Sequence, residues 1–421
     1  MIYRFGATMT GMAYLATISG GAASAQDNAV YFDRSSVTPV SEREDSRYTQ
    51  TPIESAGFLI QPEVVFSGGL NSNTLATELN EVEDTFVGFT PAVSIDSDWI
   101  RHALSAYVEV DHREYSDLPD ESRTNMKFQL RGRLDLGQST SVVLQFAGAD
   151  ETEDRTALSN LPGSLEPNEY TKTGVSLGVG HRAGRVQIQT KLGLNSYDYD
   201  DTELAGALFQ DQDFRDRDEV NAIGRLSYAL NPSTAIYAQG KHIIADYSPP
   251  NIFNAFNRDH NGTVLLAGTD FELGDTIRGD IGVGYQYYTY DDASFEDISD
   301  FAFSGQVDWM LSPSTTLSAD AERSVFDPGV ALSNAAIETG ASVKLEQGLT
   351  KKFYLTGEAG FTQYAFETID RDDDRVDLSV GANWKINRSI WLEGGYQVID
   401  QTSDVQEFTD NRMLLKMRIF P

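Results

Sequence analysis

The sequence predicts an all-β protein, a single transmembrane antiparallel up-and-down barrel of about eighteen strands. Three observations predict it: apolar and polar residues alternate in segments of strand length, short and long connections take turns along the chain, and the N-terminus has the features of an export signal. Successive side chains of a strand point to opposite faces, so each strand has one apolar and one polar face. In a membrane barrel the apolar face contacts lipid and the polar face lines the lumen.

The first 25 residues have the pattern of a secretory signal peptide. Arg4 is their only charge, an apolar run follows from Phe5, and Ala23-Ser24-Ala25 forms a cleavage site before Gln26. We expect residues 1–25 to be removed during export. No second apolar run approaches the roughly 18 residues of a spanning helix.

Composition narrows the function classes. The formal net charge of −32 argues against nucleic acid as a partner. The sequence contains no cysteine, so stability has to come from packing or from a closed hydrogen-bonded sheet. The acidic clusters 198–201 and 371–375 lack the spacing of a calcium loop, and we interpret them as solvated acidity. We expect no metal and no cofactor.

Three regions follow from these patterns. Residues 1–25 are the signal peptide, and residues 26–56 are polar without a period, as in a periplasmic tail or a plug of the lumen. Residues 57–421 form the transmembrane barrel.

Connections within the barrel alternate between short turns, expected in the periplasm, and longer acidic loops, expected outside the cell. Glycine, proline and asparagine suit the short turns because they adopt the required backbone angles. The short connections are 137–140, 183–184, 231–234, 274–275, 312–315, 348–350 and 387–388. The long ones are 71–84, 116–122, 151–168, 198–217, 248–258, 291–297, 326–333, 367–375 and 403–408.

The segment 126–136 is the clearest strand. Met126, Phe128 and Leu130 alternate with the polar residues Lys127 and Gln129. Aromatic residues next to short turns also fit a girdle at the membrane interface. These are Trp309, Trp384, Phe353 and Tyr228.

Charges on the polar faces divide into two groups along the chain. Since consecutive strands are neighbours, we expect a mainly basic wall opposite a mainly acidic one. The predicted basic wall comprises Lys127, Arg131, Arg133, Arg185, Lys191, Arg225 and Lys241. The predicted acidic wall comprises Asp280, Asp308, Asp320, Glu322, Glu338, Glu346, Glu358, Asp377 and Glu393. Two interpretations stay open: a transverse field that selects polar solutes, and a network of ion pairs that stiffens the wall.

Inward tyrosines could stack on sugar rings and so form a track for a glycan. The candidates are Tyr107, Tyr237, Tyr288 and Tyr354, with Tyr115 and Tyr364 as further inward rings. Tyrosine is also a favoured strand residue, which explains the same positions without a ligand. The five histidines are scattered without a nucleophile motif or metal-ligand spacing, so we expect no enzyme.

Several segments carry a family resemblance. Phe58–Phe66 with 71–74, Pro91–Trp99, Arg101–Leu104 ending in Tyr115, and 334–345 resemble a family of outer-membrane β-barrel porins linked to export of exopolysaccharide or capsule. The final strand, Asn411–Pro421, resembles the signal read by the barrel-assembly machinery, although its Phe420 is penultimate. The resemblance implies a barrel without catalytic residues in the cell outer membrane of a Gram-negative bacterium, in contact with outer-membrane lipid and lipopolysaccharide.

Three functions stay open from the sequence. The first is a conduit for export of an extracellular polysaccharide, with periplasmic polysaccharide-export proteins as partners of the tail. The second is a general diffusion porin for small hydrophilic solutes. The third is a closed structural or adhesive barrel that acts through its extracellular loops.

Overall fold

The computed structural model describes residues 38–43, 45–161, 163–205, 208–250 and 256–421. The expected signal peptide, residues 1–25, lies outside the described residues. Tail residues 26–37 lie outside them as well.

Eighteen antiparallel strands form one closed sheet, which confirms the predicted fold class and strand number. Each strand pairs with the next along the chain, and β21 pairs with β2 to close the barrel, with Val64 opposite Ile419. The barrel strands are β2 (Phe58–Asn71), β3 (Asp84–Ser97), β4 (Ala103–Tyr115), β5 (Arg123–Leu136), β6 (Thr140–Thr152), β7 (Glu169–Ala183), β8 (Val186–Tyr199), β11 (Arg217–Asn231), β12 (Thr234–Tyr247), β13 (His260–Leu273), β14 (Ile277–Tyr290), β15 (Ile298–Ser312), β16 (Thr315–Phe326), β17 (Ala336–Thr350), β18 (Phe353–Phe366), β19 (Asp372–Lys385), β20 (Ile390–Ser403) and β21 (Phe408–Ile419).

Three short strands lie outside this cylinder. β1 (Ile53–Ser55) folds back on the start of β2 through a turn at Ala56 and Gly57. β9 (Thr202–Leu204) and β10 (Leu208–Gln210) form a hairpin in the loop between β8 and β11. The described residues include two 3₁₀ turns, η3 (Pro119–Glu121) and η4 (Asp213–Arg215). No helix in this part of the chain is long and apolar enough to cross a membrane.

The alternation places apolar side chains on the outer face of the cylinder. In β5, Met126, Phe128 and Leu130 are between 42% and 51% exposed, whereas Lys127 and Arg131 are half-buried on the opposite face. Trp309 and Trp384 are likewise exposed next to short turns. A closed sheet can leave apolar side chains exposed in this way only when lipid covers them.

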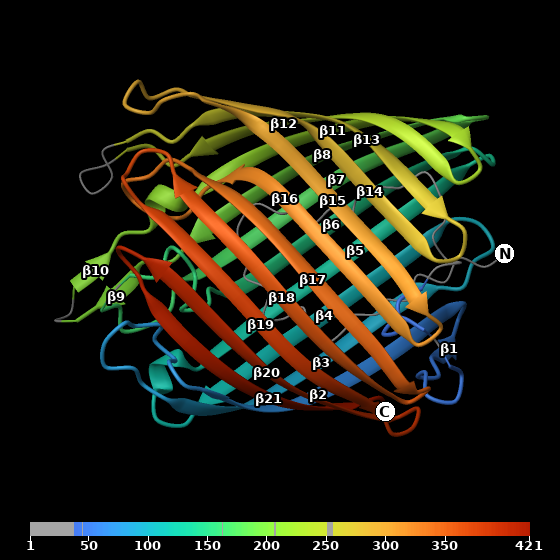
Figure 1. Ribbon diagram of the computed structural model, residues 1–421, viewed down its shortest axis with the longest axis horizontal. Coiled ribbons are helices and arrows are strands. Elements are labelled where there is room, and N and C mark those ends of the chain that lie inside the picture. The colour runs from blue at the N-terminus through green and yellow to red at the C-terminus, as the bar shows by residue number, and fades with distance from the viewer. Residues whose placement is uncertain (1–37, 44, 162, 206–207, 251–255) are drawn as a thin grey trace.

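The short and the long connections lie at opposite ends of the barrel. In Figure 1 the short turns lie at the right with β1 and the C-terminus, and the long loops lie at the left with the β9–β10 hairpin. Two turns differ from the prediction. The turn after β7 is Gly184–Arg185, where Gly184 has a φ of 59°, and the turn after β17 is Lys351–Lys352 because β17 continues to Thr350.

Candidate solute site in the lumen

The connection between β6 and β7 bends inward instead of extending into solvent. We call its described residues, 153–161 and 163–168, the mouth loop. Arg412 of β21 donates hydrogen bonds of 2.7 and 3.0 Å to the carboxylate of Asp154. Arg375 of β19 donates to the carbonyl oxygen of Thr156 at 3.1 Å and to its hydroxyl at 3.2 Å. The mouth loop is therefore bound to strands well away from those that carry it.

An apolar contact extends the mouth loop further across the opening. Leu158 belongs to one buried apolar cluster with Phe326 at the end of β16 and Phe366 at the end of β18. Because β16 lies on the other side of the cylinder from β6, the mouth loop spans the extracellular opening. On a third side, Arg155 donates to the Glu121 carboxylate at 3.0 Å.

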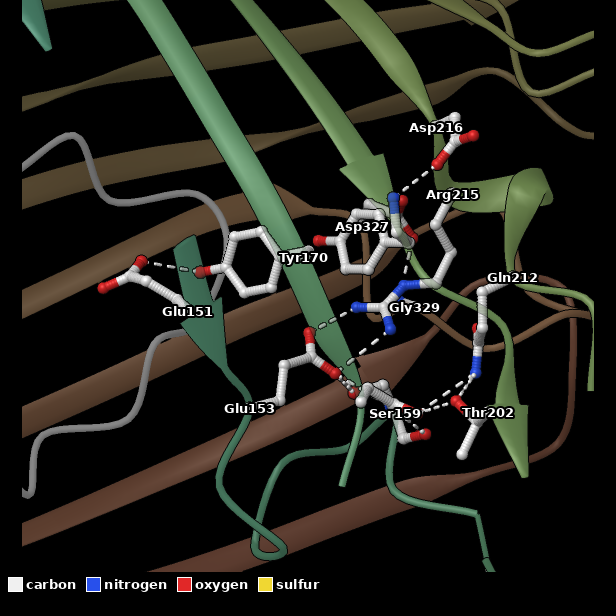
Figure 2. Close-up of polar contacts among 12 residues, drawn as sticks. Glu151, Glu153, Ser159, Tyr170, Thr202, Gln212, Arg215, Asp216, Asp327 and Gly329 are labelled. Carbon is white, nitrogen blue, oxygen red and sulfur yellow. Dashed lines mark hydrogen bonds and ion pairs between the residues drawn. The ribbon is translucent and has the colours of Figure 1, made fainter. Parts of the chain in front are cut away.

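A buried ion pair anchors the start of the mouth loop. Figure 2 shows Glu153 facing the guanidinium of Arg215, with Ser159, Thr202 and Gln212 on one side. Arg215 Nη1 lies 3.1 Å from Glu153 Oε2, and the two side chains are only 5% and 9% exposed. Burial alone would raise the pKa of Glu153, but the Arg215 charge and its hydrogen bonds outweigh burial and lower it. Both groups are therefore charged at neutral pH.

The loop after β16 lies against the guanidinium of Arg215. Gly329 has a φ of 68°, and a Cβ built there would lie 2.7 Å from Arg215 Nη2. Only glycine combines this backbone angle with such a close approach. Asp327, in the same loop, accepts a hydrogen bond from Arg258 at 3.2 Å.

At the opposite end, residues 38–43 and 45–50 occupy the periplasmic opening, and we call them the N-terminal segment. The backbone N–H and the hydroxyl of Ser41 each donate to the lumen-facing Glu346 carboxylate at 2.8 Å. The indole N–H of Trp391 donates to the carbonyl oxygen of Tyr48 at 2.9 Å. This part of the predicted tail thus lies against the inner wall, while residues 53–55 join the sheet as β1.

A cavity of about 520 Å³ lies beneath the mouth loop. Its wall comes mainly from β6 to β8 and β11 to β14, and the tips of β16 and β18 close the far side. The volume is within the roughly 300–1,000 Å³ typical of small-molecule sites. This cavity is the candidate functional site.

Cations and aromatic rings alternate along the upper wall of the cavity. Strand register places Lys172 beside Tyr197, Tyr197 beside Arg217, and Arg217 beside Tyr247. The Lys172 ammonium lies 4.8 Å and the Arg217 guanidinium 4.1 Å from the Tyr197 ring centre. One row higher, Tyr170 stacks on Tyr199 with ring centres 5.0 Å apart. These contacts hold the rings rigidly at the cavity rim.

The predicted basic residues divide between this cavity and local ion pairs. Lys191 and Lys241 line the cavity. Lys127 is paired with Glu151 at 2.5 Å, Arg133 with Asp135 at 3.2 Å, and Arg225 with Asp280. Arg131 faces the lumen on β5. The placement of Arg185 on a strand wall is wrong, because Arg185 lies exposed in the turn before β8.

The predicted acidic residues also have cationic neighbours, so the two walls are less distinct in charge than expected. Five of them are paired: Asp280 with Arg225, Asp308 with Arg278, Glu346 with Lys344, Asp377 with Arg375, and Glu393 with Arg418. The remaining four, Asp320, Glu322, Glu338 and Glu358, lie on β16 to β18.

The predicted tyrosines do not form one track. Tyr107 donates to Glu109 at 2.5 Å, and Tyr237 donates to Asp280 at 2.8 Å while Arg225 covers its ring. Tyr354 lies near Lys385 at the periplasmic end. Tyr288, and also Tyr364, line the cavity.

Sequence reasoning missed most of the cavity's rings, namely Tyr170, Tyr197, Tyr199, Tyr247 and Tyr290. They share one signal: each lies within three residues of the extracellular end of its strand, on the polar face. Grouping the tyrosines that lie on the polar face at the extracellular ends of strands would have identified these residues from the sequence.

Comparison with known proteins gives one family and several distant structural likenesses. A family model described as Putative beta-barrel porin 2 matches residues 46–420. No curated protein sequence matches the chain. Among solved structures, a BenF-like porin from Pseudomonas fluorescens Pf-5 is 11% identical with a TM-score of 0.46, over 86% of this chain and 99% of that one. OccK2 (OpdF) from Pseudomonas aeruginosa is 9% identical with a TM-score of 0.48, over 86% and 98%. The FrpB iron transporter from Neisseria meningitidis is 10% identical with a TM-score of 0.49, and this chain covers 63% of its length.

Proposed function

The chain belongs to the Putative beta-barrel porin 2 family, and from this premise we propose that it is a narrow, gated channel for small polar solutes. It is an outer-membrane β-barrel porin, in a family whose members are typically channels without enzymatic activity. What the channel carries, and how widely it opens, are the subject of the proposal.

The observation that carries the proposal is the pairing of a small cavity with an anchored mouth loop. Asp154, Thr156 and Leu158 attach the mouth loop to strands across the opening. A wide conduit needs an opening that is continuously clear, whereas a solute-sized channel needs only local movement of such a loop. The cavity of about 520 Å³ suits a molecule of one or two sugar rings.

The test is transport by the purified full-length protein in lipid bilayers. We expect discrete, small ionic currents in planar membranes, and liposome swelling with monosaccharides that falls off steeply for longer oligosaccharides. Absence of both currents and swelling, in the native chain and in a chain with a shortened mouth loop, would contradict the channel and favour a closed barrel.

A second candidate is the export of an extracellular polysaccharide. Tyrosines in the cavity lining support it, because sugars stack on aromatic faces and the rings of Tyr197 and Tyr290 are only half-buried there. Deletion of the gene, with measurement of secreted polysaccharide, tests this candidate. Unchanged secretion would rule it out and leave solute diffusion in place.

A further inference from the structure

We propose that the cavity beneath the mouth loop binds uncharged aromatic alcohols, phenols included. This inference rests on the proposed channel function and names the class of solute that the channel takes up. Three features of the cavity support it: the charged groups of its wall have partners, one end of the cavity is apolar, and a histidine at that end presents a hydrogen-bond acceptor.

The carboxylates of the cavity wall are compensated within the wall itself. Each carboxylate that lines the cavity is paired with a cation, at distances between 2.5 and 3.2 Å. The pairs are Glu151 with Lys127, Glu153 with Arg215, Asp154 with Arg412, Glu219 with Arg217, and Asp327 with Arg258.

The other cations of the lining have partners as well. Arg375 is paired with Asp377 at 3.2 Å, and Lys172 lies 4.8 Å from the centre of the Tyr197 ring. Lys241 lies in the field of the Glu219 and Glu322 carboxylates, and Lys191 has an interaction partner among the described residues. A charged solute would exchange its water shell for a wall whose charges are already paired, which is unfavourable. The wall therefore favours an uncharged solute.

One end of the cavity is apolar, although a barrel lumen is ordinarily polar. Ile243 of β12 and Tyr290 of β14 pack against a buried cluster that includes Tyr288 and Val325, and all four side chains line the cavity. Gly262 of β13 lies between Ile243 and Tyr288 in the strand register, and a Cβ built there would overlap the Tyr288 ring. The ring thus occupies the space of the missing side chain. An apolar ring that covers this wall removes it from water, which favours binding.

His260 at the start of β13 supplies a hydrogen-bonding group at the same end. Its ring centre lies 5.9 Å from that of Tyr247, 5.9 Å from that of Tyr288 and 5.4 Å from that of Tyr290. Its Nδ1 lies 3.1 Å from the carbonyl oxygen of Arg258. Because a carbonyl oxygen only accepts, Nδ1 carries the proton, and Nε2 of the neutral ring is an acceptor. Among the residues that the structure describes, none donates a hydrogen bond to this Nε2, and His260 lines the cavity.

An aromatic alcohol matches all three features. Its ring would cover the apolar wall at Ile243 and Tyr290, and its hydroxyl would donate to Nε2 of His260. A carboxylate of the same shape has no proton to donate and brings an unpaired charge. A monosaccharide has hydroxyl donors, but its hydroxylated ring covers less of the apolar wall.

The test is equilibrium binding by titration calorimetry on the detergent-solubilised full-length protein at pH 7.5. Four probes share one ring: benzyl alcohol, the anion benzoate, the cation benzylammonium, and benzyl methyl ether, which cannot donate a hydrogen bond. We expect benzyl alcohol to bind at least about tenfold more tightly than each of the other three. Equal affinity for either charged probe would overturn the uncharged class, and equal affinity for the ether would overturn the role of the hydroxyl. Tighter binding of D-galactose than of benzyl alcohol would overturn the aromatic class.

A variant connects the binding to the cavity. His260→Phe keeps an aromatic ring but removes the acceptor, so it should weaken benzyl alcohol binding about tenfold and leave the ether unchanged. Comparison of the native and variant proteins also cancels any uptake of the probe by detergent. If His260→Phe binds benzyl alcohol as tightly as the native chain does, the acceptor is wrongly assigned.

His242→Phe is the matched control. His242 is exposed on β12, outside the cavity lining, with Nδ1 2.9 Å from the Thr263 hydroxyl. A temperature-shifted migration in gel electrophoresis verifies that each variant is a folded barrel. A loss in His242→Phe as large as that in His260→Phe would show that the site lies elsewhere.

Binding and transport fail separately in this design. Selective binding of benzyl alcohol without any current in bilayers would contradict the proposed channel but keep the cavity as a site for aromatic alcohols. Currents without selective binding would keep the channel and contradict this site.

Discussion

At the scale of single residues, buried ion pairs decide the shape of the extracellular opening. We interpreted the acidic cluster 371–375 as solvated, but Asp373 is fully buried and paired with Arg371. In the mouth loop, Glu153 and Asp154 are likewise bound, by Arg215 and Arg412. Such pairs contribute little net stability when formed, yet removing one partner leaves a buried charge uncompensated. They therefore fix one loop conformation more than they strengthen the fold.

Replacing Arg215 by methionine should destabilise the mouth loop by about 3–5 kcal/mol, because Glu153 would stay buried without its cation. The readout is hydrogen exchange at the amide of Ala157, which donates to Asp154 in the native loop. The double variant R215M/E153M is the control and should lose much less. Equal losses in both variants would contradict the buried-charge explanation.

Asp216 gives this region a pH dependence. Burial, together with the neighbouring carboxylates, raises the pKa of Asp216 to about 6, although it accepts a 2.7 Å hydrogen bond from the Tyr199 N–H. A raised carboxyl pKa means that the folded state prefers the protonated form. Its stabilisation is complete below the unfolded pKa of about 4 and is lost as pH rises through about 6.

Asp216→Asn should therefore protect the Tyr199 amide more than the native chain at pH 7.5 and equally at pH 4, measured by hydrogen exchange corrected for the intrinsic rate. Asp292 is the matched control. Its pKa is lowered by hydrogen bonds from Ser294 and Asn257, so Asp292→Asn should weaken its loop at pH 7.5. Increased protection in both variants would point to a general effect of charge removal.

At the scale of elements, the strands could be predicted and the inward loop could not. Alternation is a local property, so residues such as Met126 and Phe128 identify their strand without any knowledge of the rest of the chain. The contacts of the mouth loop are with Glu121, Arg375 and Arg412, which come from distant parts of the sequence. The residue alternation in the mouth loop, or in the segments that carry its partners, gives no information about which of them come into contact. Turn positions were in error by one to three residues for a similar reason, since several short turns tolerate the same residues.

Replacing residues 155–164 by a short Gly-Ser linker should remove the contacts of Arg155, Thr156 and Leu158 and enlarge the extracellular opening. Single-channel conductance in planar bilayers should rise several-fold, because the narrowest part of a pore dominates its resistance. The loop between β14 and β15 (291–297) provides the control, and shortening it should leave the conductance unchanged. A similar increase from both changes would show that the mouth loop is not the constriction.

At the scale of the whole molecule, both openings of the cylinder are narrowed from inside by its own chain. The mouth loop lies at one end and the N-terminal segment at the other, where Ser41 is separated from its partner Glu346 by 305 residues. The predicted division into opposite basic and acidic walls overlooked the short-range ion pairs that make the two walls less distinct in charge, such as Arg278 with Asp308.

Glu346→Ala should release the N-terminal segment, because it removes the acceptor of both Ser41 hydrogen bonds. Bonds to a charged acceptor contribute roughly 1.5–3 kcal/mol each, so the displaced population should rise at least about tenfold. Limited proteolysis from the periplasmic side at Arg43 and Arg47 measures it. Glu358→Ala is the control, as Glu358 lies on β18 and, among the described residues, makes no hydrogen bond or ion pair with this segment. Unchanged cleavage in Glu346→Ala would mean that other contacts hold the segment.

The seam between β2 and β21 has a consequence for the order of assembly. Every other strand pair of the cylinder joins neighbours along the chain, but Val64 and Ile419 meet only after all the intervening hairpins exist. Closing so long a stretch of unfolded chain in one step would be entropically unfavourable, whereas hairpins added one by one shorten the gap progressively. Until the last twelve-residue strand arrives, the growing sheet has two unsatisfied edges. A chain that ends before residue 408 would therefore keep two unpaired strand edges that can pair with other chains. Only the addition of the final strand removes both edges and completes the barrel.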